Sequence, residues 1–147
     1  MASIPSLLSL VHILGLVSGV GCATAKLALL LKCRSDQAFL PVYLAVTRTL
    51  TKLIILGLAL LTLSGIGWLL VGYDFTPLLI VKLAMVATIW MLGPIIDNVV
   101  EPKFRSLAPH PGEQASSAFL QVQKRYVLLE AAATGLFYVI IVVWMLA

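Results

Sequence analysis

Residues 50–72 read LTKLIILGLALLTLSGIGWLLVG, an apolar run that carries a single charged side chain, Lys52. A helix needs about 20 mostly apolar residues to cross the hydrocarbon core of a bilayer, and this run is long enough. Three further runs meet the same requirement, at residues 6–31, 77–100 and 126–146. The sequence therefore predicts four membrane-spanning helices.

The composition of the whole chain agrees with a membrane location. Of its 147 residues, 61% are hydrophobic and 11% are charged, whereas soluble domains have about 45–50% apolar and about 25% charged residues. Four spans and their connections take up this length, so we expect one transmembrane domain, residues 1–147, without a soluble catalytic domain. The predicted fold is an all-α, up-and-down four-helix bundle in the membrane.

The positive charges are distributed unevenly over this predicted bundle. Nine of the ten Lys and Arg residues lie in stretches 26–52 and 103–125, around the first and third connections, and the tenth is Lys82. Because basic loops stay on the cytoplasmic side, we predict that both termini lie outside a bacterial inner membrane. We interpret the flanking cations as topology signals and contacts for anionic lipid, and not as a nucleic-acid-binding surface.

Two other features follow from the predicted topology. Aromatic residues gather near both membrane boundaries and predict two interfacial belts, with Trp68, Tyr73, Phe75 and Trp144 on the outer side and Phe39, Tyr43, Phe104 and Tyr126 on the inner side. Cys22 and Cys33 lie far apart on one predicted helix, about 16 Å at 1.5 Å per residue, so we expect no disulfide between them.

Four ionisable side chains within the predicted spans are candidates for chemistry: His12, Lys82, Asp97 and Glu130. A charge at the centre of a transmembrane helix costs about 2.5–3.5 kcal/mol on insertion scales, so each of them needs a partner or a function. His12 and Lys82 follow the outer ends of their spans by similar numbers of residues. We therefore expect these two side chains at a common depth.

His12 shares a helix face with Gly15 and Gly19. These small residues would admit a flat cofactor, or they would let a neighbouring helix approach while His12 bonds to a hydroxyl or carbonyl there. Lys82 either extends to the outer interface or points into the bundle. In the bundle it would hold an anion such as a porphyrin propionate, or carry a proton.

A second polar group is expected near the inner side. Asp97 and Glu130 lie at the depth of Arg48 and Lys52, which are four residues apart and share a helix face. We interpret these four residues as a charge-compensated cluster at the cytoplasmic rim, with a proton pathway or a second propionate site as the alternative. The pair Gly93-Pro94 is expected to kink the third helix beside this cluster.

Three short segments of the chain resemble the HemJ and CopD-like group of small bacterial membrane proteins. They are LVHILG at 10–15, LSGIGW at 63–68 and PLLIVKL at 77–83. For HemJ the resemblance implies a four-helix bundle that oxidises protoporphyrinogen, with His12 and Lys82 as the functional pair and haem b as a cofactor. For CopD-like proteins it implies copper handling. HemJ proteins usually carry a further histidine in the third helix, which this chain lacks.

The leading hypothesis from the sequence is a haem- or porphyrin-binding protein in membrane redox chemistry. His12 would be the axial metal ligand beside Gly15 and Gly19, Lys82 the partner of an anionic group, and Met85 one of the possible second ligands. An ion or copper transporter that uses Lys82 and the Glu130 cluster is the second hypothesis, and a non-catalytic subunit of a larger complex is the third. The expected partners are lipid, a porphyrin or quinone, and further copies of the chain or a larger membrane complex.

Overall fold

The computed structural model describes residues 3–72, 74–110 and 112–145, and these form helices and turns without any strand. The helices are α1 (Ile4–Ser35), α2 (Leu40–Leu70), α3 (Pro77–Ile95), α4 (Glu101–Ser106) and α5 (Ser117–Met145), with a π-helix, η2 (Ile96–Val100), joining α3 to α4. In the described residues, four helical segments are long and apolar enough to cross a membrane. The predicted all-α class with four such helices is therefore confirmed.

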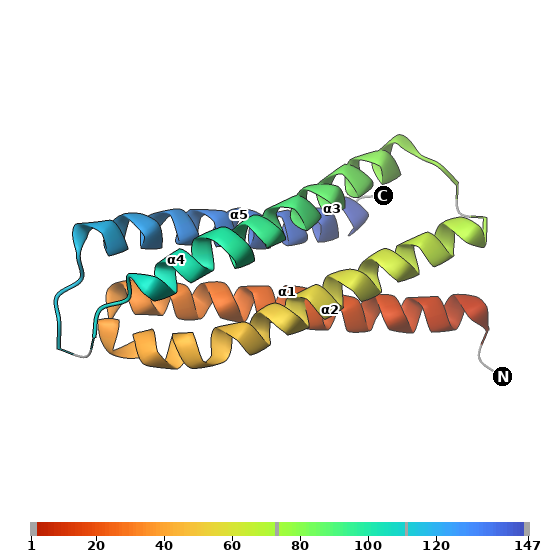
Figure 1. The fold of residues 1–147 in the computed structure, drawn as a ribbon. Helices are drawn as coiled ribbons and strands as arrows, with labels where there is room; N and C mark the ends of the chain where they lie inside the picture. The colour runs from red at the N-terminus through yellow and green to blue at the C-terminus, as the bar shows by residue number, and fades with distance from the viewer. Residues whose placement is uncertain (1–2, 73, 111, 146–147) are drawn as a thin grey trace.

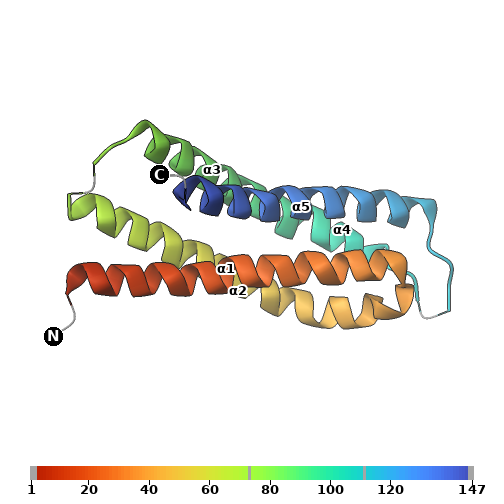
Figure 2. The ribbon, with the colours of Figure 1, turned by 180° about the vertical axis from the view of Figure 1, so that it is seen from behind.

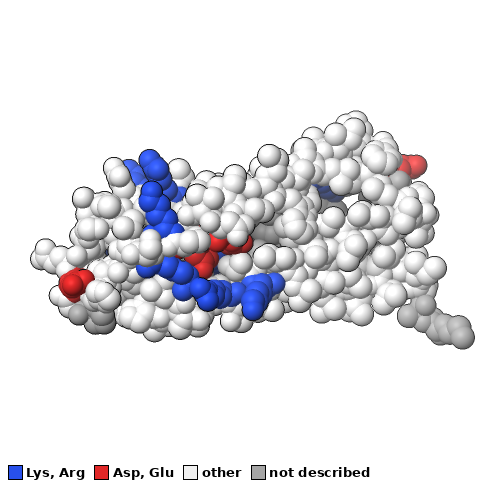
Figure 3. Space-filling view, viewed as in Figure 1, with Lys and Arg blue, Asp and Glu red and all other residues white. Residues whose placement is uncertain are grey.

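The four segments run up and down along one axis (Figure 1). The start of α1, the α2–α3 connection and the end of α5 lie at one end of the molecule, which we call the terminal end (Figures 1 and 2). The α1–α2 turn and the α4–α5 connection lie at the opposite end, which we call the basic end. Figure 3 shows basic side chains gathered over the basic end, with acidic side chains among them. Which end faces the cytoplasm stays a prediction.

The helices at the basic end are longer than the sequence predicted. α1 continues to Ser35 and α2 begins at Leu40, so the expected connection around 32–49 shrinks to Asp36 and a 3₁₀ turn, Gln37–Phe39. α5 likewise begins at Ser117 and not at 126. The prediction ended each span where the apolar run ended. Helical hydrogen bonding continues past that point because Lys, Arg and Gln are good helix formers.

Side-chain caps fix where two of the helices begin. The Ser3 hydroxyl accepts a hydrogen bond from the Ser6 backbone N–H at the start of α1. The Thr76 hydroxyl does the same for the Leu79 N–H at the start of α3, directly before Pro77. A hydroxyl at the N-cap followed by proline is a strong helix start, because it satisfies one free N–H and the proline needs no partner.

The closest helix pair is α1 with α2, and glycines line their crossing. A Cβ added to Gly57 of α2 would overlap the backbone of Gly19 of α1, and one added to Gly15 would lie 2.9 Å from the Gly57 oxygen. Small residues at a crossing let two backbones approach closely. α5 packs on α1 and α3, whereas α2 and α3 are not a closely packed pair. A hydrogen bond from Trp90 Nε1 to Thr62 Oγ1, 3.1 Å long, bridges them.

The basic end contains an aromatic core, three members of which were predicted to lie at the membrane interface. Tyr43, Phe104, Phe119 and Tyr126 are fully buried against one another, and the rings of Phe104 and Phe119 stack with centroids 5.0 Å apart. The predicted inner belt is therefore wrong for Tyr43, Phe104 and Tyr126, because helices that extend beyond the apolar runs bury these rings between them. Phe39 is exposed.

The aromatic residues at the terminal end are less buried. Phe75 and Trp144 are 70% and 64% exposed, as an interfacial position requires. Trp68 is partly buried. Tyr73, which was also predicted in this belt, lies outside the described residues.

Candidate functional site

Lys26 is the most deeply buried charged residue of the described chain, with a side chain that is 2% exposed. Its Nζ lies 2.7 Å from Glu130 Oε1 and donates a 2.9 Å hydrogen bond to Thr51 Oγ1. Nζ is also 3.4 Å from Asp97 Oδ1 and 3.5 Å from Glu101 Oε2. We call these five residues the Lys26 cluster. Because Lys26 is on α1 and its partners are on α2, η2, α4 and α5, one ammonium group joins all four spans.

The position of Lys26 corrects the sequence interpretation, which counted it among the cations flanking the first connection. α1 continues to Ser35, so Lys26 lies in the helix interior and contacts the other spans. The sequence held a signal for this. Lys26 is followed by LALLL at 27–31, inside the predicted span 6–31, and so it met the same criterion as Lys82.

A second layer of hydrogen bonds connects Glu101 to the aromatic core. Glu101 Oε1 accepts from Arg105 Nε at 3.0 Å, and Oε2 accepts from the Tyr126 hydroxyl at 3.1 Å. The Tyr43 hydroxyl donates to the Tyr126 oxygen at 2.8 Å, and Arg105 also donates to the Leu44 carbonyl. Hydroxyls and charged groups thus form one buried network from α2 through α5 to the Lys26 ammonium. Such networks fix their members in place when every group is satisfied.

The charges of the groups that pair with one another here do not balance when all are ionised, although the exposed Arg48 and Lys52 lie beside them at the rim. Lys26 and Arg105 contribute two positive charges, while Asp97, Glu101 and Glu130 contribute three negative ones. Glu130 is buried, and the Lys26 ammonium, 2.7 Å from its Oε1, is the cation that it contacts. Removing ions from water costs several kcal/mol each. A buried carboxylate in excess of its paired cations, on helices apolar enough to cross a membrane, is therefore a candidate functional site.

The backbone at Asp97 departs from the regular α-helix. Pro94 lies in the last turn of α3, where it provides no N–H and clashes with the preceding turn. The chain continues as the π-helix Ile96–Val100, which carries Asp97 toward Lys26. The irregularity expected at Gly93-Pro94 therefore takes the form of a π-helix. Such π segments are frequent at functional sites.

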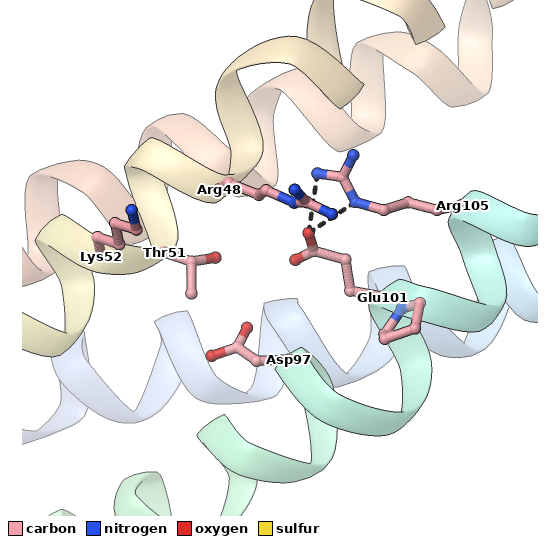
Figure 4. Close-up of a pocket in the computed structure, with 7 residues that line it drawn as sticks. Arg48, Thr51, Lys52, Asp97, Glu101 and Arg105 are labelled. Atoms are coloured by element: carbon pink, nitrogen blue, oxygen red, sulfur yellow. Dashed lines mark hydrogen bonds and ion pairs between the residues drawn. The ribbon is translucent and has the colours of Figure 1, made fainter.

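Two cavities meet at the Lys26 cluster. The central cavity, about 230 Å³, is lined by residues of all four spans, among them Lys26, Thr51, Asp97 and Glu130 at its polar end and Ile54, Leu58, Ile89, Trp90 and Phe137 along its walls. The rim pocket, about 270 Å³, is lined by Arg48, Thr51, Lys52, Asp97, Glu101, Pro102 and Arg105 (Figure 4). Thr51 and Asp97 line both, so they lie between the two cavities.

The predicted cluster of Arg48, Lys52, Asp97 and Glu130 is found in part. Arg48 and Lys52 line the rim pocket with Asp97, and Figure 4 shows Arg48 extending from α2 toward the Glu101–Arg105 pair. Among the ion pairs of the described residues, however, Asp97 and Glu130 pair with Lys26 and not with Arg48 or Lys52. The physical reason is burial, because Arg48 and Lys52 are exposed while Lys26 reaches the interior.

His12 bonds to the neighbouring helix in a defined way. Its Nδ1 lies 2.8 Å from Ser64 Oγ on α2, and that hydroxyl donates its own proton to the Leu60 carbonyl at 2.7 Å. A hydroxyl has one proton, so with that proton on the Leu60 carbonyl Nδ1 is the donor to Ser64, and in the neutral ring Nε2 then carries the lone pair. The Lys82 ammonium interacts electrostatically with the His12 ring. No hydrogen bond between His12 and Lys82 is found among the described residues, and Met85 lies one turn beyond Lys82 on α3.

The glycine face beside His12 is covered by α2. Gly15 lies against Gly57 and Leu61, and Gly19 lies against Gly57. Of the two interpretations of these glycines, the structure contains close helix packing, and this face is not open to a flat cofactor in the described arrangement. Neither of the two cavities includes His12 or Lys82.

The described residues contain no group of three or more His, Cys, Asp or Glu side chains arranged to hold a metal ion. Cys22 and Cys33 are both free thiols, as expected from their separation.

Comparisons with protein-family models, with curated proteins and with solved structures found no match for this chain. The resemblance to HemJ and CopD-like proteins therefore stays a prediction from short segments.

Proposed function

We propose that this chain is a proton-coupled membrane transporter whose ion-binding site is the Lys26 cluster. The observation that carries the proposal is a buried ammonium group in contact with three carboxylates from η2, α4 and α5, at the point where two cavities meet. The predicted setting, a bacterial inner membrane with both termini outside, is part of the same proposal.

The excess negative charge of the Lys26 cluster would couple proton binding to a rearrangement of the helices. Three carboxylates compete for Lys26, and the Glu101 carboxylate also has Arg105. The surplus negative charge at Asp97 and Glu130 favours binding of a proton or another monovalent cation. When one of these carboxylates is neutralised, Lys26 shifts toward the other. Because Asp97 and Glu130 belong to different spans, neutralisation changes which helices attract one another, and this biases the bundle between two arrangements.

The two cavities supply access to the site. The rim pocket carries Arg48 and Lys52 at the basic end, and the central cavity extends between the spans on the other side of Asp97. A site that can be approached from two directions, near an irregular helix segment, is the arrangement that alternating-access transporters use. The π-helix at Asp97 is such a segment.

The test is the dissipation of a pH gradient in liposomes. The purified protein is reconstituted with a pH-sensitive dye inside acidic vesicles, and Na⁺, K⁺, choline or octyltrimethylammonium is added outside. We expect at least one cation to release protons from the vesicles with the wild type and not with Glu130→Gln. Lys103→Gln, which changes an exposed cation on α4, is the matched control and should behave as the wild type. No cation-driven proton release, or full activity in Glu130→Gln, would refute the proposal.

A second candidate function, haem or porphyrin binding at His12, would need a face other than the one that α2 covers at Gly15 and Gly19, and it has one specific observation in its favour. The bond from Nδ1 to Ser64 fixes the ring and directs the lone pair of Nε2 away from it, which is how proteins commonly prepare an axial imidazole ligand. Haem would supply electron-transfer chemistry at that position. The test is the visible absorption spectrum of the purified protein after haem addition. A haem band that His12→Ala removes would support this candidate, and its absence in the wild type would exclude it.

A further inference from the structure

We infer that the substrate exchanged for protons is a hydrophobic monovalent organic cation, with its charged head at the Lys26 cluster and its apolar part in the central cavity. The inference rests on the proposed function and names the substrate class of the same site. It draws on three properties of the central cavity, which are its charge, its walls and its access.

The charge of the central cavity favours a cation. Its lining includes Lys26 with one positive charge and Asp97 and Glu130 with two negative charges. Glu101 does not change this balance because Arg105 pairs with it at 3.0 Å. Glu130 is 4% exposed and lines the cavity, with its Oε1 2.7 Å from the Lys26 ammonium. One unit of positive charge is therefore needed at the polar end to balance Asp97 and Glu130 against Lys26.

The walls of the cavity favour an organic cation over a metal ion. Away from the polar end, the lining is aliphatic and aromatic, with Ile54, Leu58 and Ile89 beside Trp90 and Phe137. Hard metal cations bind where six or more oxygen ligands surround them, and these walls offer none. Aromatic faces attract organic ammonium groups through cation–π interactions, and the aliphatic residues would bury an alkyl or aryl group.

Access to the cavity leads from the bilayer. The hydrogen bond from Trp90 to Thr62 bridges α2 and α3, which are otherwise not closely packed. Wall residues from both helices reach the protein surface, where Ile55 is 48% and Trp90 is 39% exposed. These exposed side chains lie on spans that face lipid. A hydrophobic cation concentrates in the membrane, so it would enter between α2 and α3 without first crossing water.

The exchange balances in charge and atoms. The cation binds as the protonated carboxyl group of Asp97 or Glu130 releases its proton, so that one positive charge enters the site and one leaves. Lys26 keeps its proton throughout. No covalent bond other than the carboxyl O–H breaks.

The experiment is isothermal titration calorimetry on the protein in phosphatidylcholine nanodiscs, with three ligands that share an eight-carbon chain. Octyltrimethylammonium is cationic, octanol is neutral and octanoate is anionic. We expect saturable binding of the cation, at least about tenfold tighter than that of octanol, and no saturable binding of octanoate. Glu130→Gln should weaken cation binding by about tenfold or more, while Lys103→Gln should leave it unchanged. Thermal unfolding of both variants shows that the fold is retained.

The outcomes separate the substrate class from the proposed function. Preferred binding of octanoate, or equal binding of all three ligands, would overturn the inference. If Na⁺ or K⁺ drives proton release from liposomes while octyltrimethylammonium neither binds nor drives release, the inference is wrong and the transporter proposal stands. If no cation drives proton release and octyltrimethylammonium does not bind, both are wrong. Asp97→Asn, tested in the same way, should lose cation binding as Glu130→Gln does. If neither variant loses cation binding, the assignment of the site is wrong.

Discussion

The two ends of this bundle differ in what holds the helices together. At the basic end, α1, α2, α4 and α5 surround a fully buried aromatic core and the Lys26 cluster, in which ion pairs join α1 to η2, α4 and α5 and a hydrogen bond joins α1 to α2. Toward the terminal end, α1 and α2 are joined by glycine packing and the His12–Ser64 bond, while α3 contributes one buried residue, Ile89. In the described residues, the buried charged side chains of Lys26, Glu101 and Glu130 therefore lie beside the aromatic core, and not beside the short segments that resemble known families.

The basic end also carries more buried charge than stability alone would require. A dense core with balanced charges would be sufficient for stability, because burying a charge gains little over an apolar side chain of similar size. The basic end instead retains an excess carboxylate beside two cavities. We therefore expect substitutions there to affect both folding and activity, and substitutions at the terminal end to affect mainly local packing.

The largest expected effect comes from Lys26→Met, which leaves the carboxylates of Asp97 and Glu130 without a cation. Removing one member of a buried ion pair costs about 3–5 kcal/mol of unfolding free energy. The loss should shrink as the pH is lowered, because protonated carboxyl groups no longer need a positive partner. The measurement is thermal unfolding in detergent across a pH series. Lys82→Met is the matched variant at the terminal end and should cost less than about 1 kcal/mol. Equal losses from the two variants would remove the distinction between the ends.

The next effect concerns the glycine crossing. Gly57→Ala places a methyl group against the backbone of Gly19, which the two helices can relieve only by moving apart. Overpacking of this kind costs about 1–3 kcal/mol. Gly65→Ala on the same helix meets nothing within 4 Å and serves as the control. It should be neutral or stabilise α2 by up to about 1 kcal/mol, because alanine is the better helix former. Thermal unfolding measures both, and an equal response would refute the assigned crossing.

A smaller effect is expected from Tyr126→Phe. This change removes the hydroxyl that donates to Glu101 and accepts from Tyr43. The loss of stability should be about 1–3 kcal/mol, since the Tyr43 hydroxyl and a charged acceptor both lose their partner. Tyr138→Phe removes an exposed hydroxyl near Thr24 and should cost less than about 1 kcal/mol. If the two tyrosine variants unfold at the same temperature, the buried network contributes no more than an exposed bond.

The smallest expected effect on stability is that of Ser64→Ala, which removes the partner of His12 Nδ1. His12 is only partly buried, so the cost should be about 1 kcal/mol. Thermal unfolding of Ser64→Ala beside His12→Ala measures it. Because both variants break the same bond, their losses should not add in the double variant. Additive losses would show that the two side chains do not interact.

Much of the fold followed from the sequence because hydropathy runs directly determine which segments can cross a membrane. The four apolar runs predicted four helices, and the position of the basic residues matches one end of the bundle. The helix ends were harder to predict, because the residues there are polar or mixed and give no hydropathy signal. These residues are 32–35, 40–49 and the start of α5. The π-helix Ile96–Val100 was not predicted, because a proline indicates an irregular helix but does not specify which irregular form follows it.

The candidate site was predicted only in part, because the sequence does not show which side chains pair with one another across helices. Asp97 and Glu130 were identified by their place in apolar runs, but the same rule was not applied to Lys26, which was grouped with nearby surface cations. The position of a side chain along its own span follows from the sequence of that span, whereas its partner depends on how the other three spans pack around it. The glycines beside His12 were ambiguous for the same reason, because only the position of Gly57 on α2 determines what covers them.

The central claim is that carboxyl groups of the Lys26 cluster gain and lose protons. The most direct measurement is pH-difference infrared spectroscopy of the protein in lipid, which detects the C=O stretch of a protonated, buried carboxyl group without knowledge of the substrate. We predict such a band in the wild type, its loss in either Glu130→Gln or Asp97→Asn, and no change in Lys103→Gln. A spectrum without this band, or one that both cluster variants leave unchanged, would show that the cluster is a fixed structural ion network.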